Sequence, residues 1–351
     1  MMFRWRATKK LLPLLAGMAL LLSACGRADL SALNPQGPVA KQQFELMMVA
    51  VGIMTLVVVV VFAILLYVLV RYRRRKGDNT IPMQVEGNHK LEIIWTVIPV
   101  VLLTILAVPT VGAVAKLSED YWEDPNALQV KVTAHQYWWE FEYPQYGITT
   151  MQELIVPTDR KIAFELVAAD VKHSFWIPAI GGKMDTNTGL TNRMYLEFPN
   201  EGVYRGKCAE LCGPSHAYMD FKAKAVDPAS FERWVAAMKG PAKLPEDPEL
   251  RDTFVSKCLS CHAVGDQGAS GGPNLTGIGS RLTIGGILYN DTPENEWVVD
   301  PAITEKNLRT WITDPQSVKP GNMMPSAEQL QLTQEQIDGI AKYLAGYTLD
   351  Y

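Results

Sequence analysis

The sequence predicts a multi-domain membrane protein with a two-helix transmembrane hairpin, a β-sandwich or barrel, and a small all-α domain. Three observations predict this fold class. Long apolar runs lie in the first third of the 351 residues, short alternating strands fill the middle, and helical stretches bound the C-terminal region. This length is enough for two or three domains. The net charge of -4 argues against a nucleic-acid partner.

Residues 1–24 have the pattern of a lipoprotein signal peptide. Four basic residues precede the short apolar run Leu11–Leu22. The segment ends in Leu-Ser-Ala followed by Cys25 and Gly, which resembles a bacterial lipobox. We therefore expect Cys25 to become the lipid-bearing first residue of the mature chain. The alternative is an ordinary signal peptide followed by a chance cysteine.

Two transmembrane spans are predicted at about 46–70 and 93–114, within an N-terminal unit of residues 25–116. Each apolar run exceeds the roughly 20 residues that cross a bilayer. The basic cluster Arg71–Lys76 follows the first span and marks the cytoplasmic side. We expect a two-pass protein of the bacterial cell membrane, with everything after the hairpin on the extracytoplasmic face.

Residues 117–226 are predicted to form a β domain. Val130–Ala134 and Lys161–Leu166 alternate between apolar and polar residues, as half-buried strands do. Turn signals such as Pro199–Gly202 separate the strands, which favours a sandwich or barrel.

The segment GKCAELCGPSHAYM in this β domain gathers soft metal ligands. Cys208, Cys212, His216 and Met219 suit copper far better than magnesium or calcium. A second histidine must come from elsewhere, and His173 is the obvious candidate. Two cysteines, two histidines and a methionine exceed the needs of one copper ion and suit a pair bridged by both sulfurs. A disulfide, a zinc knuckle or plain buried cysteines are the alternatives, although zinc sites favour shorter Cys spacing and lack Met.

A linker and a third domain follow. Residues 227–248 contain an expected helix, Ala229–Met238, and then a proline-rich stretch that makes a semi-rigid spacer. Residues 249–351 hold Cys258-Leu-Ser-Cys261-His262, the attachment pattern of a c-type haem with His262 as proximal ligand. A chance pentapeptide or a redox dithiol is the alternative.

The third domain as a whole resembles a class I cytochrome c. Helices are expected over Pro248–Lys257 and Thr333–Gly346, and Gly272–Leu275 resembles the segment whose proline carbonyl orients the proximal histidine. The family places its axial Met directly before Pro, which implies Met324. Its neighbour Met323 remains an alternative. A His/Met pair raises the haem potential, which suits electron donation to copper.

The hairpin and β domain, about residues 40–226, resemble subunit 2 of the haem–copper cytochrome c oxidases, with a cupredoxin-like copper domain. The match lies in Glu92–Pro99, in Asp170–Pro178 and in the copper loop 208–219. The resemblance implies that Glu92 lies at the mouth of a proton channel in the partner subunit. For the dinuclear copper centre (CuA), it implies the following set: Cys208 and Cys212 as bridges, His173 and His216 as terminal ligands, Met219 and the Glu210 carbonyl as weak ligands. The Glu210 side chain would bind a magnesium ion shared with subunit 1.

The run His135–Phe141 is unusually aromatic, and most of its rings are expected in the core. In the family this run includes the aromatic residue through which electrons enter from cytochrome c. Tyr137 stands at the family's usual Trp position, so Tyr137, Trp138 and Trp139 are all candidates. A further expectation is an acidic face near this run that docks a basic cytochrome. Its members would be Glu140, Glu142 and Glu153.

Together, the three parts resemble subunit 2 of a caa3-type oxidase. This implies electron transfer from cytochrome c to haem c, to CuA and then to haem a, haem a3 and CuB of subunit 1, where O2 becomes water and protons are pumped. Expected partners are subunits 1 and 3, membrane lipid, and reduced cytochrome c or a membrane-bound cytochrome. No O2-reducing site is expected on this chain, because three of its five histidines are already ligands. The alternatives are a quinol oxidase subunit 2, a copper chaperone and a nitrous oxide reductase.

Overall fold

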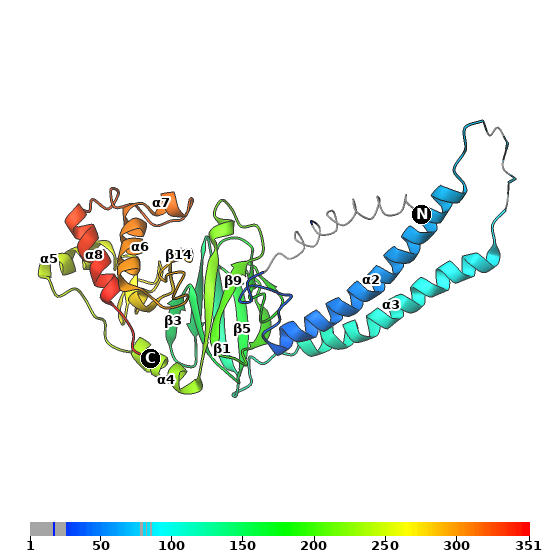
Figure 1. Cartoon of the computed structure of the whole chain (residues 1–351). Helices are drawn as coiled ribbons and strands as arrows, with labels where there is room; N and C mark the ends of the chain where they lie inside the picture. The colour runs from blue at the N-terminus through cyan, green and yellow to red at the C-terminus, as the bar shows by residue number, and fades with distance from the viewer. Residues whose placement is uncertain (1–16, 18–25, 78–79, 82, 85) are drawn as a thin grey trace.

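A computed structural model describes residues 17, 26–77, 80–81, 83–84 and 86–351 of the chain. The expected signal peptide, apart from Gly17, and Cys25 lie outside these residues. The rest forms three units, and the β sandwich stands between the helical hairpin and the C-terminal domain (Figure 1).

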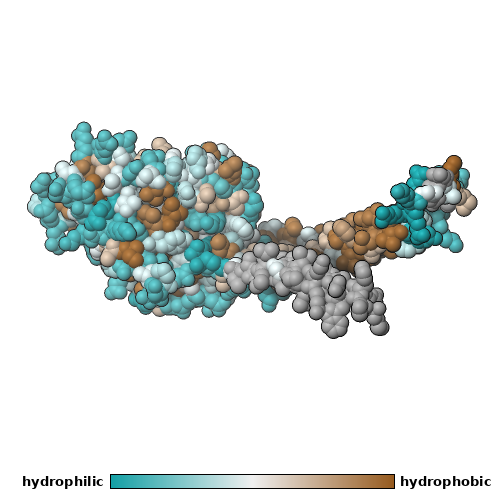
Figure 2. Space-filling model, turned by 45° about the horizontal axis from the view of Figure 1, so that its top comes forward, coloured by the Kyte–Doolittle hydropathy of each residue, from teal (hydrophilic) through white to brown (hydrophobic). Residues whose placement is uncertain are grey.

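The hairpin consists of helices α2 (Pro38–Arg71) and α3 (His89–Leu117). At 1.5 Å per residue both exceed the roughly 30 Å core of a bilayer, and both are apolar enough to cross it. Their side chains form a continuous apolar surface, and a polar tip lies at the α2–α3 turn (Figure 2). The Asn88 side chain caps α3 by accepting from the Lys90 and Leu91 amides. His89 is therefore the first residue of this helix.

The β domain is a sandwich of two five-stranded sheets. The first has the order β3-β2-β1-β5-β8 and the second β4-β10-β9-β6-β7. The strands are β1 (Leu128–His135), β2 (Trp138–Tyr143), β3 (Ile148–Met151), β4 (Glu153–Pro157), β5 (Lys161–Ala168), β6 (His173–Trp176), β7 (Met184–Thr186), β8 (Asn192–Glu197), β9 (Gly202–Cys208) and β10 (Asp220–Val226).

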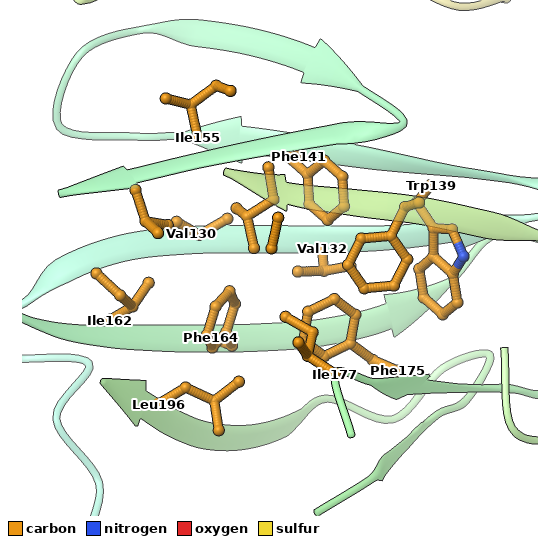
Figure 3. Packing of buried hydrophobic residues seen from close by; sticks show 14 of the residues in the cluster. Val130, Val132, Trp139, Phe141, Ile155, Ile162, Phe164, Phe175, Ile177 and Leu196 are labelled. Atoms are coloured by element: carbon orange, nitrogen blue, oxygen red, sulfur yellow. The ribbon is translucent and has the colours of Figure 1, made fainter. Parts of the chain in front are cut away.

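Alternating side chains build the core between the sheets. Strand β1 is buried at every second residue, as its sequence pattern predicts. Phe175 stacks on Phe221 with ring centroids 5.0 Å apart, and Trp139 meets both rings. Figure 3 shows Trp139 close to Phe175 in this part of the core. These aromatic rings fill the end of the core beneath the cysteine loop, so the loop has a rigid base.

The C-terminal domain is reached through helix α4 and contains mainly helices. Helix α4 (Pro228–Met238) packs on the sandwich core, and the elements of the C-terminal domain are α5 (Pro248–Lys257), η2 (Ile278–Ser280), α6 (Pro301–Thr313), α7 (Pro315–Val318) and α8 (Gln334–Gly346). The expected all-α fold is confirmed in these helices. Two short ribbons were not expected: β11 (Ala263–Val264) with β12 (Gln267–Gly268), and β13 (Thr283–Ile284) with β14 (Leu288–Tyr289). A separate apolar cluster joins α5, α6 and α8.

Candidate copper and haem sites

The cysteine loop connects two paired strands of the sandwich. Strand β9 ends at Cys208, and the chain returns through the short 3-10 helix η1 (His216–Tyr218) into β10. The Cys208 amide donates to the Met219 carbonyl at 3.1 Å, which closes the base of the loop. Strand β6 brings His173 alongside, because its Phe175 pairs with Cys208. The remote histidine therefore reaches the loop through sheet pairing.

The five side chains predicted as copper ligands converge. The two sulfurs of Cys208 and Cys212 lie 3.9 Å apart, far longer than a disulfide bond of about 2.05 Å. His173 Nδ1 lies 3.8 Å from Cys208 Sγ, and His216 Nδ1 lies 3.6 Å from Cys212 Sγ. Met219 Sδ lies 3.8 Å from Cys212 Sγ.

These distances between donor atoms fit a pair of metal ions held by the same cluster of side chains. Two ligands with bonds of about 2.0 and 2.3 Å at a tetrahedral angle lie roughly 3.5 Å apart. His173, Cys208 and the Glu210 carbonyl, 3.2 Å from Cys208 Sγ, gather on one side. Cys212, His216 and Met219 gather on the other. The donors are nitrogen and sulfur atoms in a buried cluster, which suits copper.

Asp170 positions His173, and sequence reasoning did not single it out. Its Oδ1 atom lies 2.8 Å from His173 Nε2, so Nδ1 faces the thiol of Cys208. Burial alone would raise the pKa of Asp170, but hydrogen bonds from His173 and two backbone amides lower it on balance. A carboxylate on the outer nitrogen fixes the ring of a metal-binding histidine. The feature of the sequence that could have identified Asp170 is its position three residues before the candidate histidine.

Electrostatics in the cluster favour a thiolate. Hydrogen bonding with the Cys212 thiol, and then with His173, lowers the pKa of Cys208 well below its ordinary value. The resulting thiolate raises the pKa of Cys212. Burial would lower the pKa of His173, but its bonds to Cys208 and Asp170 raise it. The lowered pKa of one thiol favours the thiolate form that a cation binds, and metal binding would release the proton of the other thiol.

The Glu210 side chain lies half-buried beside the loop. Within the described residues, the group of three or more His, Cys, Asp or Glu donors that lie within 4.8 Å of one another is His173, Cys208 and Cys212, and the Glu210 carboxylate is not part of it. The expected magnesium site at the Glu210 carboxylate therefore stays a prediction that needs ligands from a partner.

The haem-attachment residues follow the end of α5. The amides of Cys261 and His262 both donate to the Cys258 carbonyl, which places the two thiols and the imidazole on one turn. His262 Nδ1 donates to the Pro273 carbonyl at 2.7 Å, so Nε2 is left free to bind a metal. Burial lowers the pKa of His262, which favours the neutral ring that a metal requires.

The two neighbouring methionines differ in their surroundings. Met323 is 93% exposed, whereas Met324 is half-buried at the apolar cluster of the C-terminal domain (residues 249–351, the candidate haem domain). Trp311 Nε1 donates to Met324 Sδ at 3.0 Å. The geometry thus favours Met324 as the sulfur ligand, and Trp311 is a second residue that sequence reasoning missed.

The aromatic run forms a corner and not one continuous strand. His135 ends β1, a turn follows, and Trp138 begins β2, so the run His135–Phe141 is divided between two strands. The His135 ring stacks on Trp138 with centroids 4.0 Å apart. Tyr137 and Trp139 are 3% and 0% exposed. Trp138 packs against the apolar cluster of the haem domain. The three candidates therefore lie at or beneath the contact between the two domains.

Glu92, expected at a proton channel, and Glu153, expected on an acidic docking face, lie in different surroundings. Glu92 lies in the first turn of α3, 3.5 Å from His89, in a position that helix dipoles favour. Glu153 is only 4% exposed and accepts from the Leu282 amide of the haem domain. It therefore cannot belong to an open acidic docking face. The expectation from its position near the aromatic run in the sequence is wrong.

Comparisons with known proteins agree on all three units. Residues 31–112 match the transmembrane domain of cytochrome c oxidase subunit II, 147–226 match its periplasmic domain, and 251–347 match cytochrome c. The cytochrome c oxidase subunit 2 of Bacillus sp. (strain PS3) is 49% identical over 356 residues, which cover 95% of this chain and 96% of that one. The chain belongs to the cytochrome c oxidase subunit 2 family. It is thus a membrane-anchored subunit of a haem–copper terminal oxidase, of the caa3 type with a fused cytochrome c domain.

Two other relatives show how much of the chain each kind of oxidase subunit matches. The cytochrome c oxidase subunit 2 of Alkalihalophilus pseudofirmus is 43% identical over 349 residues, 97% of each chain. A quinol oxidase subunit 2 of Bacillus subtilis is 37% identical, but over 69% of this chain and 76% of its own length. The periplasmic oxidase domain implies CuA copper, and the cytochrome c domain implies haem c.

Proposed function

We propose that this oxidase subunit receives electrons from a cytochrome c on its own haem c and passes them through CuA to subunit 1. There O2 is reduced to water while protons are pumped. One observation supports the route above all: the loop with Met324 lies on the copper loop. Ser215 Oγ, next to His216, donates to the Pro320 carbonyl at 2.6 Å.

The proposed roles follow the geometry. Cys208 and Cys212 would hold the copper pair together with His173, His216, Met219 and the Glu210 carbonyl. For the haem, the proposed ligands and attachment residues are Cys258, Cys261, His262 and Met324. When bound, each group supplies a one-electron carrier, and the protein's part is to hold rigid ligands so that little rearrangement accompanies each transfer.

The haem domain covers the aromatics through which a soluble donor would reach copper directly. An ideal Cβ on Gly321 would lie 3.5 Å from the Tyr137 ring, so this loop lies against Tyr137. The donor, either soluble cytochrome c or a membrane-bound cytochrome, therefore delivers its electron to the haem. Tyr137, Trp138 and Trp139 then lie on the internal part of the route.

Purified oxidase tests the proposal. Haems a and c should co-purify with this chain, and reduced cytochrome c should drive oxygen uptake. A Cys258→Ser, Cys261→Ser double variant should lose haem c and that uptake while it keeps the copper absorption. Uptake driven by quinol alone would refute the proposal and favour a quinol oxidase.

The membrane arrangement is proposed from the same pattern. The hairpin unit 25–116 places the copper domain 117–226, the linker 227–248 and the haem domain 249–351 outside the cell, with a lipid anchor on Cys25. Palmitate labelling that is undiminished in a Cys25→Ser variant would exclude the anchor.

Glu92 and Glu210 are assigned roles at the contact with subunit 1. Glu92 lies at the mouth of a proton channel, and the Glu210 carboxylate binds the shared magnesium ion. Unchanged turnover and proton uptake in a Glu92→Gln oxidase would exclude the first role. Full magnesium content in a Glu210→Gln oxidase would exclude the second.

A further inference from the structure

A glycine turn of the haem domain reaches the copper domain beside a copper ligand. Gly285 and Gly286 join β13 to β14 with φ of +60° and +85°. An ideal Cβ on Gly286 would lie 2.5 Å from the carbonyl oxygen of Asp220 and 2.5 Å from Gln152 Nε2. Asp220 directly follows Met219. The contact is thus too close for any side chain at position 286.

Two buried lysines hold the carbonyl groups of this turn. Lys319 of the haem domain donates to the Gly285 carbonyl at 2.7 Å. Lys222 of β10 donates to the Gly286 carbonyl at 3.4 Å, and its ammonium lies 4.9 Å from the Tyr289 ring centroid. These lysines are 2% and 0% exposed. A buried ammonium needs such partners. The turn therefore accepts hydrogen bonds from one lysine of each domain.

Neighbouring contacts fix the same orientation. The Leu282 amide donates to the buried carboxylate of Glu153 on β4. The Arg205 guanidinium of β9 lies over the rings of Tyr289 and Trp297, at 5.1 and 5.2 Å from their centroids. Three strands of one sheet therefore contact a single short segment of the haem domain. A domain that swings on its linker would not need such specific, buried contacts.

We propose that the Gly285–Gly286 turn locks the haem domain onto the copper domain in one orientation. The turn also joins the two candidate sites. The Trp311 ring, whose Nε1 donates to Met324 Sδ, lies against Gly285, and Gly286 lies against Asp220 beside Met219. The consequence for electron transfer rests on the proposed function: a fixed separation makes the haem-to-copper rate independent of solvent viscosity.

Two matched variants test the lock. Gly286→Ala adds a methyl group against backbone atoms across the interface. Gly321→Ala is the control, because Gly321 has a similar φ of +81° and lies at the same interface, but its Cβ would meet Tyr137 at an ordinary 3.5 Å. Spin labels attached without cysteine chemistry at exposed Thr188 and Lys342 report the distance between the domains in the full oxidase.

The wild type and Gly321→Ala should each give one narrow distance distribution, and Gly286→Ala a broad one. Haem and copper absorption should stay unchanged in all three, which excludes misfolding. A broad wild-type distribution, or a narrow one in Gly286→Ala, would overturn the proposal. Light-triggered electron transfer should slow and become viscosity-dependent only in Gly286→Ala. If no electron passes from haem to copper in any variant, the proposed function fails while the distances still decide the lock.

Discussion

The proposed role of His173 as a copper ligand requires the ring orientation that the carboxylate of Asp170 holds, 2.8 Å from Nε2. Asp170→Asn should weaken copper affinity by about 10- to 100-fold, because the ring loses the charged partner that orients it. Competition with a chelator measures this. Asp185→Asn is the control, since Asp185 pairs with Lys172 and no hydrogen bond or ion pair found for it involves His173. Equal losses in both variants would contradict an orienting role.

A second residue-scale prediction separates the two neighbouring methionines. Met324→Leu should abolish the sulfur-to-iron absorption band and lower the haem potential, because a His/Met pair raises that potential. Met323→Leu should change neither, since this side chain is 93% exposed. The spectrum of the oxidised haem domain decides between them. Survival of the band in Met324→Leu would move the axial role to Met323.

Most proposed site residues could be found from the sequence because they lie close together along it. Four of the proposed side-chain copper ligands share one loop, and three of the proposed haem residues share one turn. His173 was found because a second histidine was needed and its segment resembled a known family. Asp170 and Trp311 were not singled out, because their roles depend on which atom a ring presents, and spacing alone does not give that.

The elements were largely predictable where local chemistry sets their ends. Helices α4, α5 and α6 each begin with Pro after an Asp whose side chain accepts from the first-turn amides. The strands β1 and β5 followed from their alternation. The corner after His135 was missed, because its aromatic residues favour strands. The position of the turn depends on how the strands pack in the core, which the local sequence does not give.

Helix α8 offers a test at this scale. Thr333 and Gln336 form a capping box at its start. Thr333→Ala should destabilise the haem domain by about 1 kcal/mol, because an amide loses its partner. Thr310→Ala in α6 is the control, since its hydroxyl only bonds back to the Lys306 carbonyl within the helix. Denaturant unfolding followed at the haem measures both, and equal effects would contradict the capping role.

At the scale of the whole molecule, the order of the three units was predictable but their contact was not. The proline-rich linker left open whether the haem domain swings or stays docked. The answer lies in pairs of residues more than 60 positions apart, such as Lys222 with Gly286. Glu153 shows the difficulty: its sequence neighbourhood indicated an exposed acid, and only the docked haem domain buries it.

Glu153 also makes the docked molecule sensitive to pH. Burial raises the pKa of Glu153, although the Leu282 amide and nearby Arg281 and lysines act against this. The folded state therefore binds a proton more readily than the unfolded state. It should lose stability as pH rises from the ordinary glutamate pKa through the raised one, by at most about 1.4 kcal/mol per pH unit.

Glu153→Gln should remove this loss, because the amide keeps an acceptor for Leu282 but carries no charge. Unfolding of the full chain between about pH 5 and 8 measures the effect, with the variant gaining on the wild type as pH rises. The exposed Glu201→Gln should run parallel to the wild type. A Glu153→Gln curve parallel to the wild type would show that the carboxyl is not held in a buried contact, and the docked arrangement of the two domains would then lose one of its supports.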